Sequence, residues 1–302
     1  MSLTQHIKSK ALDLGFSACG VSKQEYLKQE SEQFKLWIDS GYSGEMEYMK
    51  NHFEMRFNPE LLASGVKSIV SLAYNYYSNK TQMPNAPIIS KYAFGEDYHN
   101  VIKDKLNELL TFAKQQNSNV EGRGFVDSAP VPEKTWAQKS GIGWLGKNSN
   151  IIIKNKGSFY FLAELMLNIE LEYDTPATDS CGTCTRCIDS CPTQAITKPY
   201  MVDSRKCISY LTIELKGNAP ENMKGNYANR MFGCDICQDV CPWNIRFAEP
   251  NKENRFQPKE ELLLKTKHEW ENLTQEEFDT LFAKSAVKRT KYSGLKRNIA
   301  AI

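Results

Sequence analysis

The chain lacks long apolar runs, a leader-like start and strong net charge. No apolar run approaches the roughly 20 residues that cross a bilayer. The first residues, MSLTQHIKSKALDLGF, contain neither a secretory apolar core nor a twin-arginine pair. We therefore expect a cytoplasmic protein. Its 38 Lys and Arg residues nearly balance 36 Asp and Glu residues, so the net charge of +2 does not by itself identify a nucleic-acid binder.

Several catalytic motifs are also missing. There is no Walker loop, no HExxH and no DxHxxG pattern that would supply a histidine to cobalamin; His99 lacks the required glycine. The stretch GIGWLG, with Gly141, Gly143 and Gly146, matches GxGxxG. A dinucleotide site needs a strand before this motif and a helix after it. Here helix-like PEKTWAQKS precedes it and strand-like NIII follows, so we expect the glycines to make tight turns or permit a close backbone approach.

The remaining composition is globular, with 41% apolar and 25% charged residues. Apolar spacing predicts helices over 3–14 and 99–116 and a second pair of helices around a Gly-rich turn over 34–49. Strands are predicted over 68–77 and 123–127, with a hairpin over 150–167 that turns at NKG. Thr274 and Glu277 predict a capping box, with a staple between Leu273 and Phe278.

These patterns divide the chain into three expected parts. Residues 1–175 alternate strands and helices and predict an α/β domain. Residues 176–248 combine cysteines with short loops and little periodicity, as in a domain organised by something other than an apolar core. Residues 249–302 predict a helical, basic segment. The fold class we expect is α+β.

Eight of the nine cysteines lie between residues 181 and 241. In a reducing compartment this clustering favours metal over disulfides. CGTCTRCIDSCP has the bacterial ferredoxin spacing, in which three thiolates bind one cluster and the Cys-Pro thiolate reaches a second. Zinc is the alternative for soft thiolates, but zinc sites usually use paired CxxC hooks. The cysteines of the CGTCTRCIDSCP run are Cys181, Cys184, Cys187 and Cys191.

The second run, CDICQDVCP, is a ferredoxin run with Met231 in place of its first cysteine. Cys207 is the nearby thiol that can replace it. The crossover rule then assigns Cys181, Cys184, Cys187 and Cys241 to one cluster, and Cys191, Cys207, Cys234 and Cys237 to the other. Cys19 is left over and is expected to be a buried apolar residue. Two adjacent clusters predict an electron relay.

Asp127 follows a predicted strand and precedes two prolines in FVDSAPVPEK. A carboxylate in such a stiff loop is well placed for acid–base chemistry. From the pattern alone, an Asp that caps the following turn is the favoured interpretation.

With these residues in view, the chain resembles the epoxyqueuosine reductase family over nearly its whole length. The shared motifs are MRFNPELL, SIVSLAYNYY, KYAFGEDYH, VDSAPVPEKTWAQKSGIGWLGKN, CISYLTIE, SAVKRTKYSGLKRN and the two cysteine runs. The resemblance implies a cobalamin-dependent iron–sulfur enzyme that removes the epoxide oxygen from epoxyqueuosine at the wobble position of tRNA. It also implies an N-terminal cobalamin domain similar to that of reductive dehalogenases.

The same resemblance assigns site residues. Asp127 becomes the proton donor, with a pKa that burial beside the corrin should raise. Cobalamin neighbours are expected at Arg56, Tyr98, Asp127, Gly143, Lys147, Asn148 and Ser209. Contacts with tRNA phosphates are expected at Lys288, Arg289, Lys291, Lys296 and Arg297. The implied partners are the tRNA and an external low-potential electron donor, and we expect a monomer with no membrane partner.

Two other functions fit part of the pattern. One is a reductive-dehalogenase-like protein that acts on a small molecule, although the missing twin arginine and the basic C-terminal segment argue against it. The other is an electron-transfer module without catalysis of its own. Many family members continue into a helical-repeat domain, whereas this chain ends at Ile302, as either a naturally short or a trimmed form.

Overall fold

A four-stranded antiparallel sheet forms the centre of the computed structural model, which describes residues 1–218 and 220–302. Its order is β1-β2-β7-β4, and all three strand pairs are antiparallel. The strands are β1 (Ala18–Lys23), β2 (Ser68–Asn75), β7 (Tyr160–Leu167) and β4 (Gly122–Phe125). An antiparallel sheet packed with helices is an α+β fold, as expected.

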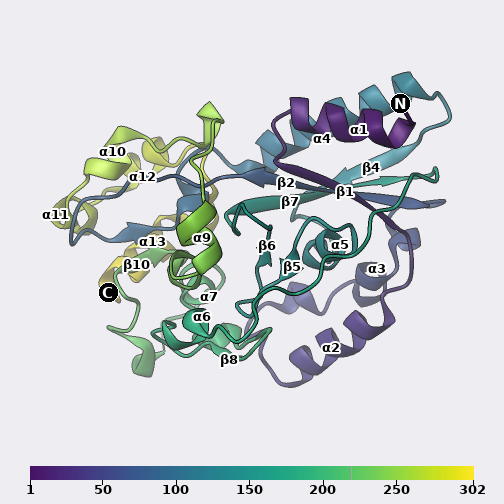
Figure 1. Ribbon diagram of the computed structural model, residues 1–302. Helices are drawn as coiled ribbons and strands as arrows, with labels where there is room; N and C mark the ends of the chain where they lie inside the picture. The colour runs from purple at the N-terminus through teal and green to yellow at the C-terminus, as the bar shows by residue number, and fades with distance from the viewer. Residues whose placement is uncertain (219) are drawn as a thin grey trace.

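Helices cover both faces of this sheet (Figure 1). α1 (Leu3–Asp13) and α4 (Tyr98–Gln116) lie on one face, and α5 (Glu133–Lys139) lies on the other. Along β2, Val70 and Leu72 face the α1–α4 core, whereas Ile69 packs with Trp136 of α5. Burial on both faces explains the nearly continuous apolar sequence of this strand.

The predicted helices 3–14 and 99–116 are confirmed. Ser2 and Gln5 form a capping box at α1, and Asp97 caps α4 by accepting a hydrogen bond from the His99 backbone. Within 34–49, α2 (Lys28–Asp39) and a short 3₁₀ turn (Glu47–Met49) flank a turn in which Gly41 and Gly44 have positive φ.

The hairpin predicted over 150–167 is wrong. β6 (Ile151–Ile152) pairs with β5 (Trp144–Leu145), while β7 pairs with β2 and β4. Only one bridge, Ile153 to Gly157, spans the NKG turn. The apolar segment 160–167 instead fills the centre of the main sheet, where both of its faces are buried.

The described residues of the cysteine-rich segment, 176–218 and 220–248, form only short elements, as expected from their weak periodicity. They are α6 (Arg186–Asp189), β8 (Ile196–Lys198), β9 (Met201–Val202), α7 (Ile208–Ile213), β10 (Arg230–Phe232), α8 (Ile236–Asp239) and α9 (Pro242–Phe247). β10 pairs in parallel with β3 (Ile88–Ile89), so this segment joins the N-terminal part through backbone hydrogen bonds.

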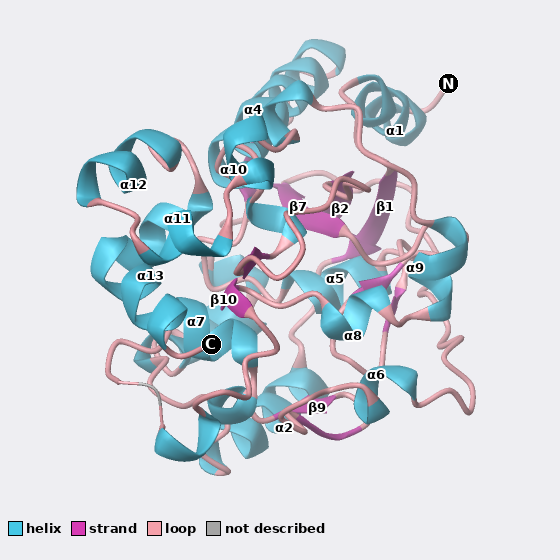
Figure 2. Ribbon diagram, turned by 90° about the vertical axis from the view of Figure 1, so that its left-hand side faces the viewer, coloured by secondary structure: helices cyan, strands magenta, loops and turns pink. Residues whose placement is uncertain are grey.

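The C-terminal segment is helical and lies on the side of the molecule that faces the viewer in Figure 2. Its helices are α10 (Glu260–Leu264), α11 (Lys267–Glu271), α12 (Gln275–Leu281) and α13 (Lys291–Ala300). The capping box of Thr274 and Glu277 is confirmed, and Leu273 and Phe278 share one apolar core. That core also includes Ile89 and Phe232, so it draws on all three parts of the chain.

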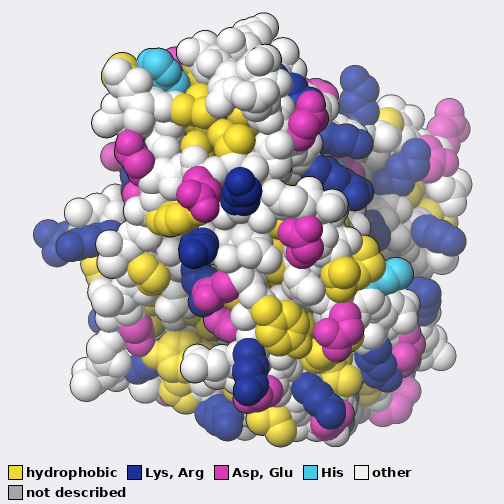
Figure 3. Space-filling view, turned by 90° about the vertical axis from the view of Figure 1, so that its right-hand side faces the viewer, with side chains coloured by type: hydrophobic (Ala, Val, Ile, Leu, Met, Phe, Trp, Pro, Cys, Tyr) yellow, Lys and Arg dark blue, Asp and Glu magenta, His cyan; other side chains and the backbone are white. Residues whose placement is uncertain are grey.

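Within residues 1–218 and 220–302, no helix combines the length and apolar character required to cross a bilayer. On the face shown in Figure 3, basic and acidic side chains are interspersed. This mixture agrees with the small net charge of the whole chain.

Candidate active site and iron–sulfur centres

Thiols of the first predicted set influence one another electrostatically in the structure. Burial, followed by the neighbouring thiolates of Cys181, Cys241 and Cys184, raises the pKa of Cys187 to about 11. The pKa of Cys241 is also raised, by burial first and then by Cys181 and Cys184. Cys241 thus joins the first run in space although it belongs to the second run in sequence.

The other four thiols form a second group. Burial raises the pKa values of Cys207, Cys234 and Cys237. Neighbouring thiols raise them further: Cys191 acts on Cys207, and Cys207 acts on both Cys234 and Cys237. These thiols therefore lie near one another. Cys237 also interacts with Cys187 of the first group. These interactions agree with the grouping expected from the sequence, and the assignment of the eight cysteines to two clusters stays a prediction.

Backbone N–H groups are directed at several of these sulfurs. Cys207 precedes α7 and accepts from the N–H groups of Ser209 and Tyr210, while Cys241 precedes α9 and accepts from Trp243 and Asn244. In the same way, the Ala195 N–H donates to Cys191 Sγ over 3.3 Å. Such N–H···S bonds stabilise negative charge on a thiolate or on a bound cluster.

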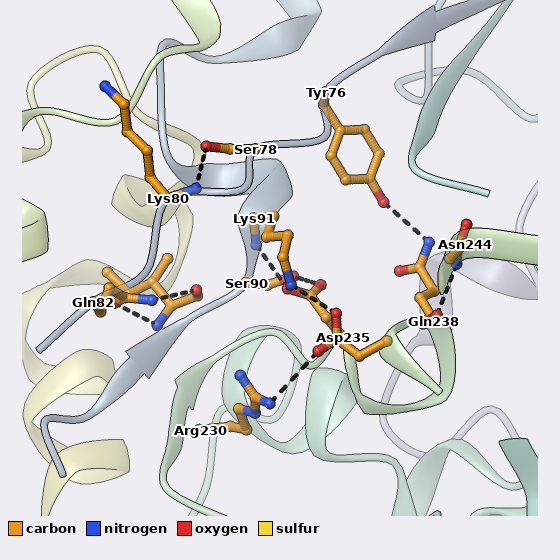
Figure 4. Close-up of polar contacts among 12 residues, drawn as sticks. Tyr76, Ser78, Lys80, Gln82, Ser90, Lys91, Arg230, Asp235, Gln238 and Asn244 are labelled. Atoms are coloured by element: carbon orange, nitrogen blue, oxygen red, sulfur yellow. Dashed lines mark hydrogen bonds and ion pairs between the residues drawn. The ribbon is translucent and has the colours of Figure 1, made fainter. Parts of the chain in front are cut away.

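A buried polar network attaches the second cysteine run to the N-terminal part (Figure 4). Asp235, only 2% exposed, lies between Cys234 and Cys237 in sequence and accepts hydrogen bonds from the Ser90 hydroxyl and, over 2.9 Å, from the Lys91 backbone. Lys91 Nζ also lies 2.7 Å from Asp239 Oδ1. This network fixes the loop that carries Cys234 and Cys237.

Asp127 follows β4 and lies in a cluster of polar side chains. Its Oδ2 accepts a 2.6 Å hydrogen bond from the Tyr98 hydroxyl and lies 3.2 Å from His99 Nε2. The opposite ring nitrogen of His99 lies 2.6 Å from Asp97 Oδ1. Asp127 has φ of 50°, a left-handed conformation that Asp tolerates better than most residues. The end of β4 and the start of α4 together position these four side chains.

The expected upward shift in the pKa of Asp127 is wrong for this arrangement. Burial raises the pKa, but hydrogen bonds from His99 and Tyr98 and the charges of His99 and Arg289 outweigh it, so the pKa lies below its usual range. Hydrogen bonds with Asp127 and Asp97 raise the pKa of His99 to about 9. At neutral pH the proton of the Asp127–His99 pair therefore resides on the imidazole.

The cluster is accessible to solvent and is also closely surrounded by protein atoms, and this partly enclosed site is called the recess below. The Asp127 side chain is 48% exposed and Lys134 is also exposed, yet burial is the largest influence on the pKa of each. Lys134 interacts with Asp127 on one side and with Cys207 and Cys237 on the other, so the second thiol group adjoins this recess.

Arg56 and Tyr98 lie in the region of Asp127, and their contact with cobalamin stays a prediction. The Arg56 guanidinium lies 5.3 Å from the Phe34 ring, and its buried Nε has no hydrogen-bond partner among the described residues. Tyr48 interacts with both Arg56 and Asp127, which places Arg56 in the same region. Tyr98 stacks on Phe161 with ring centroids 4.2 Å apart. An unpartnered donor beside a recess is suited to a polar group of a ligand.

Three other expected cofactor neighbours have different surroundings. A side chain on Gly143 would meet the Ile152 carbonyl oxygen at 2.4 Å, so the close approach of β5 and β6 explains this glycine. Lys147 Nζ donates to the carbonyls of Gly182 and Cys184, and Asn148 Nδ2 donates to that of Cys237. Lys147 and Asn148 therefore hold the cysteine loops, whereas Ser209 lies beside Cys207 as expected.

The basic C-terminal residues fall into two groups. Lys288, Arg289 and Lys291 are exposed, and Lys288 and Arg289 line a pocket of about 600 Å³ that extends to Asp97. Arg289 also forms a 2.8 Å ion pair with Glu214. Lys296 and Arg297 are only partly exposed and donate to backbone carbonyls, with Arg297 bonded to Leu211, Leu215 and Gly217. These bonds give the last two residues a structural role.

Sequence reasoning missed two participants in the acid–base cluster. His99 was considered only as a cobalt ligand, although its place in the first turn of α4 beside Asp97 could have suggested a partner for Asp127. Glu133, whose Oε1 accepts the Asp127 N–H over 2.6 Å, left no comparable pattern. Cys19 is the unused thiol expected, because burial raises its pKa to about 12.

Two adjoining groups of four thiols beside an acid–base recess define an iron–sulfur oxidoreductase. Residues 180–244 match the family model described as "4Fe-4S double cluster binding domain", so the chain binds two [4Fe-4S] clusters. Residues 56–128 match the model described as "Epoxyqueuosine reductase QueG, DUF1730". The chain belongs to the epoxyqueuosine reductase family.

Individual relatives support this membership. The chain is 54% identical to an epoxyqueuosine reductase of Cellulophaga algicola, over 97% of this chain and 95% of the relative. A selenomethionine-labelled epoxyqueuosine reductase structure matches with a TM-score of 0.91 at 30% identity, covering 99% of this chain and 80% of the other. An epoxyqueuosine reductase solved with an epoxyqueuosine-modified tRNA-Tyr stem loop matches with a TM-score of 0.87, with the same identity and coverage.

Proposed function

We propose that this protein reduces epoxyqueuosine to queuosine at the wobble position of tRNA, the last step of queuosine synthesis. The observation that supports this proposal most directly is the Asp127–His99 pair, which lies in a recess that adjoins the second thiol group. A proton source beside an electron relay is what removal of an epoxide oxygen requires. Related proteins bear this enzyme name, and one related structure holds the modified tRNA stem loop.

The electron path follows from which thiol group is nearer the recess. Cys181, Cys184, Cys187 and Cys241 would hold the outer cluster, and Cys191, Cys207, Cys234 and Cys237 would hold the inner one. Lys134 interacts with Cys207 and Cys237 but with none of the first group among its principal neighbours, which supports this order. An external low-potential donor of single electrons would supply the outer cluster.

Cobalamin is the remaining cofactor that the family implies. The recess fits a large ligand, since the buried Arg56 Nε lacks a partner and Asp127 and Lys134 are accessible although largely surrounded. Arg56, Tyr98 and Ser209 would hold the group. Cobalamin, when bound, supplies a cobalt centre able to carry reducing equivalents from the inner cluster to the substrate.

The chain's own residues provide the proton. His99 holds it at neutral pH, and the 3.2 Å contact between Nε2 and Asp127 Oδ2 offers a direct path to the carboxylate. Tyr98 orients the same oxygen through its 2.6 Å hydrogen bond. Asp127 would then protonate the departing epoxide oxygen. The donor is therefore the pair rather than an isolated neutral carboxylic acid.

The exposed basic residues Lys288, Arg289 and Lys291 would contact tRNA phosphates. Phosphate contacts position a nucleic acid without reading its sequence, which suits recognition of one modified base by the recess itself. Lys288 and Arg289 line the same pocket as Asp97, whose carboxylate contacts His99 of the Asp127–His99 pair. We propose that residues 1–175 form the catalytic part, 176–248 carry the clusters and 249–302 assist tRNA binding, in a cytoplasmic monomer.

The test is turnover by reduced protein containing both clusters and cobalamin, on a tRNA stem loop that bears epoxyqueuosine. Nucleoside mass spectrometry should show loss of one oxygen atom from the modified base. An electron-transfer module would oxidise its clusters with an artificial acceptor but leave the nucleoside unchanged. That second outcome would overturn the proposed function.

A further inference from the structure

Glu164 is a carboxylate in the middle of the central sheet. It lies on β7 between Ser71 of β2 and Phe125 of β4, and it is fully buried. Neither of its carboxylate oxygens has a hydrogen-bond partner among residues 1–218 and 220–302. A position of this kind is normally apolar, so the acidic side chain needs an explanation.

Glu164 must be neutral in this environment. Its principal electrostatic neighbour is another acid, Glu133, and no cation lies among the groups that influence it. An ionised carboxylate without a counter-charge or hydrogen bond costs several kcal/mol to bury. Burial first, and then the charge of Glu133, accordingly raise the pKa of Glu164 far above its usual range.

Further polar atoms lie on the same side of the sheet, toward α5. Ser71 Oγ, Ser22 Oγ and Trp136 Nε1 are buried, and none of them has a partner among the described residues. Ser22 lies opposite Ile69, whose side chain packs with Trp136. Groups of this kind commonly bind internal water, which conducts protons. The layer between the sheet and α5 therefore contains a polar region that includes Glu164.

Glu133 connects this region to the active site. It lies in the first turn of α5, and its Oε1 accepts the backbone N–H of Asp127 over 2.6 Å. The charged groups that face it are Asp127, Lys134 and His99, together with Glu164 from β7. Burial, and then the charge of Asp127, raise the pKa of Glu133. Both acids thus retain protons at neutral pH, directly behind the Asp127 loop.

The proposed reaction needs two protons. Both C–O bonds of the epoxide break, a C=C bond forms, and the oxygen leaves as water, which consumes two electrons and two protons. The external donor supplies the electrons singly through the clusters. The Asp127–His99 pair holds one transferable proton, so the second must reach the pair from elsewhere during the reaction.

We propose that Glu164 and Glu133 form a buried proton store that supplies the second proton to the Asp127–His99 pair. The proton passes from Glu164 through internal water to Glu133 and then to Asp127, and bulk solvent replaces the proton on Glu164 in the same step, so that its buried carboxylate does not remain ionised. This inference rests on the proposed function. Both glutamates act through Asp127 and do not touch the substrate.

Two substitutions test the store. Glu164→Gln keeps the shape but cannot hold a transferable proton, and Glu164→Leu fills the site with an apolar side chain that should fold at least as stably. Glu121→Gln is the control, because Glu121 is a surface acid whose side chain is 70% exposed. Infrared spectra at neutral pH should show carboxylic-acid carbonyl absorption from Glu164 and Glu133 in wild type and Glu121→Gln, and both Glu164 variants should lose the part that comes from Glu164. This readout does not depend on turnover.

Single turnover of the reduced holoenzyme is the second measurement. Both Glu164 variants should form product about tenfold more slowly at pH 8, with unchanged tRNA affinity and a smaller deficit at pH 6, where solvent supplies protons readily. An unchanged infrared band would overturn the store, as would wild-type rates between pH 6 and pH 9 in both variants. If wild type fails to convert the substrate, the proposed function fails instead, whereas the band still reports on Glu164.

Discussion

Replacing Asp127 with Asn tests whether the Asp127–His99 pair donates the proton. Asn keeps the size of the side chain and can still accept a hydrogen bond from Tyr98, but it cannot carry the proton to the substrate. Loss of a general acid lowers rates by about 10²–10⁴, which corresponds to about 3–5 kcal/mol of barrier. We expect this loss in single turnover, with cluster content and tRNA affinity retained.

The same substitution should change the titration of His99. Wild-type His99 has a pKa of about 9, supported first by Asp127 and then by Asp97. The pair therefore keeps its proton at neutral pH and loses it as the pH rises through about 9, so the wild-type rate should fall on the alkaline side there.

Asp97→Asn provides the matched comparison. It weakens the 2.6 Å contact with His99 but leaves Asp127 in place, and Asn remains a good cap for α4. The rate at pH 6 should stay near that of wild type, while the alkaline decline should move to lower pH. Full activity in Asp127→Asn, or an unmoved alkaline decline in Asp97→Asn, would refute the paired donor.

Further predictions concern the clusters, the basic segment and stability. Cys207→Ala should retain about four of eight iron atoms by iron analysis, because only the inner cluster loses a ligand; loss of all iron would contradict independent sites. Lys288→Ala should weaken stem-loop binding and reduce the salt dependence of the logarithm of affinity by about one unit, without changing stability. Arg297→Ala should lower the free energy of unfolding by about 2–4 kcal/mol, measured by denaturant titration, because three backbone carbonyls lose a charged donor. His99 should add stability that is fully present below about pH 6.5, its ordinary pKa, and is lost as pH rises through about 9. Without solvent screening, the rise in the pKa of His99 corresponds to about 3 kcal/mol of stability. Solvent around the half-exposed Asp127 reduces this contribution to about 1–2 kcal/mol. His99→Gln should remove this alkaline loss from pH-dependent melting curves.

The cysteine ligands could be grouped from sequence because thiolate spacing is a local constraint. Two-residue gaps limit which sulfurs reach one cluster, and the absent cysteine at Met231 left Cys207 as the replacement. Apolar spacing likewise predicted α1 and α4, because helical periodicity depends on near neighbours. The family resemblance could be recognised for a related reason, since its motifs are contiguous stretches.

Only the tertiary structure decided the pairing of β7 and the charge state of the acid–base residues. The hairpin prediction failed because β7 pairs with β2 and β4, strands that are distant in sequence, and strand spacing alone carries no such information. The pKa of Asp127 depends on His99 and Tyr98, which are 28 and 29 residues away in the chain. The hydrogen bonds of Lys147 and Asn148 with the cysteine loops could not be foreseen for a similar reason, because sequence gives proximity to a motif but not the direction of a side chain. The cysteine motifs were thus a local property of this sequence, whereas proton location depends on which distant groups the fold brings within a few ångströms.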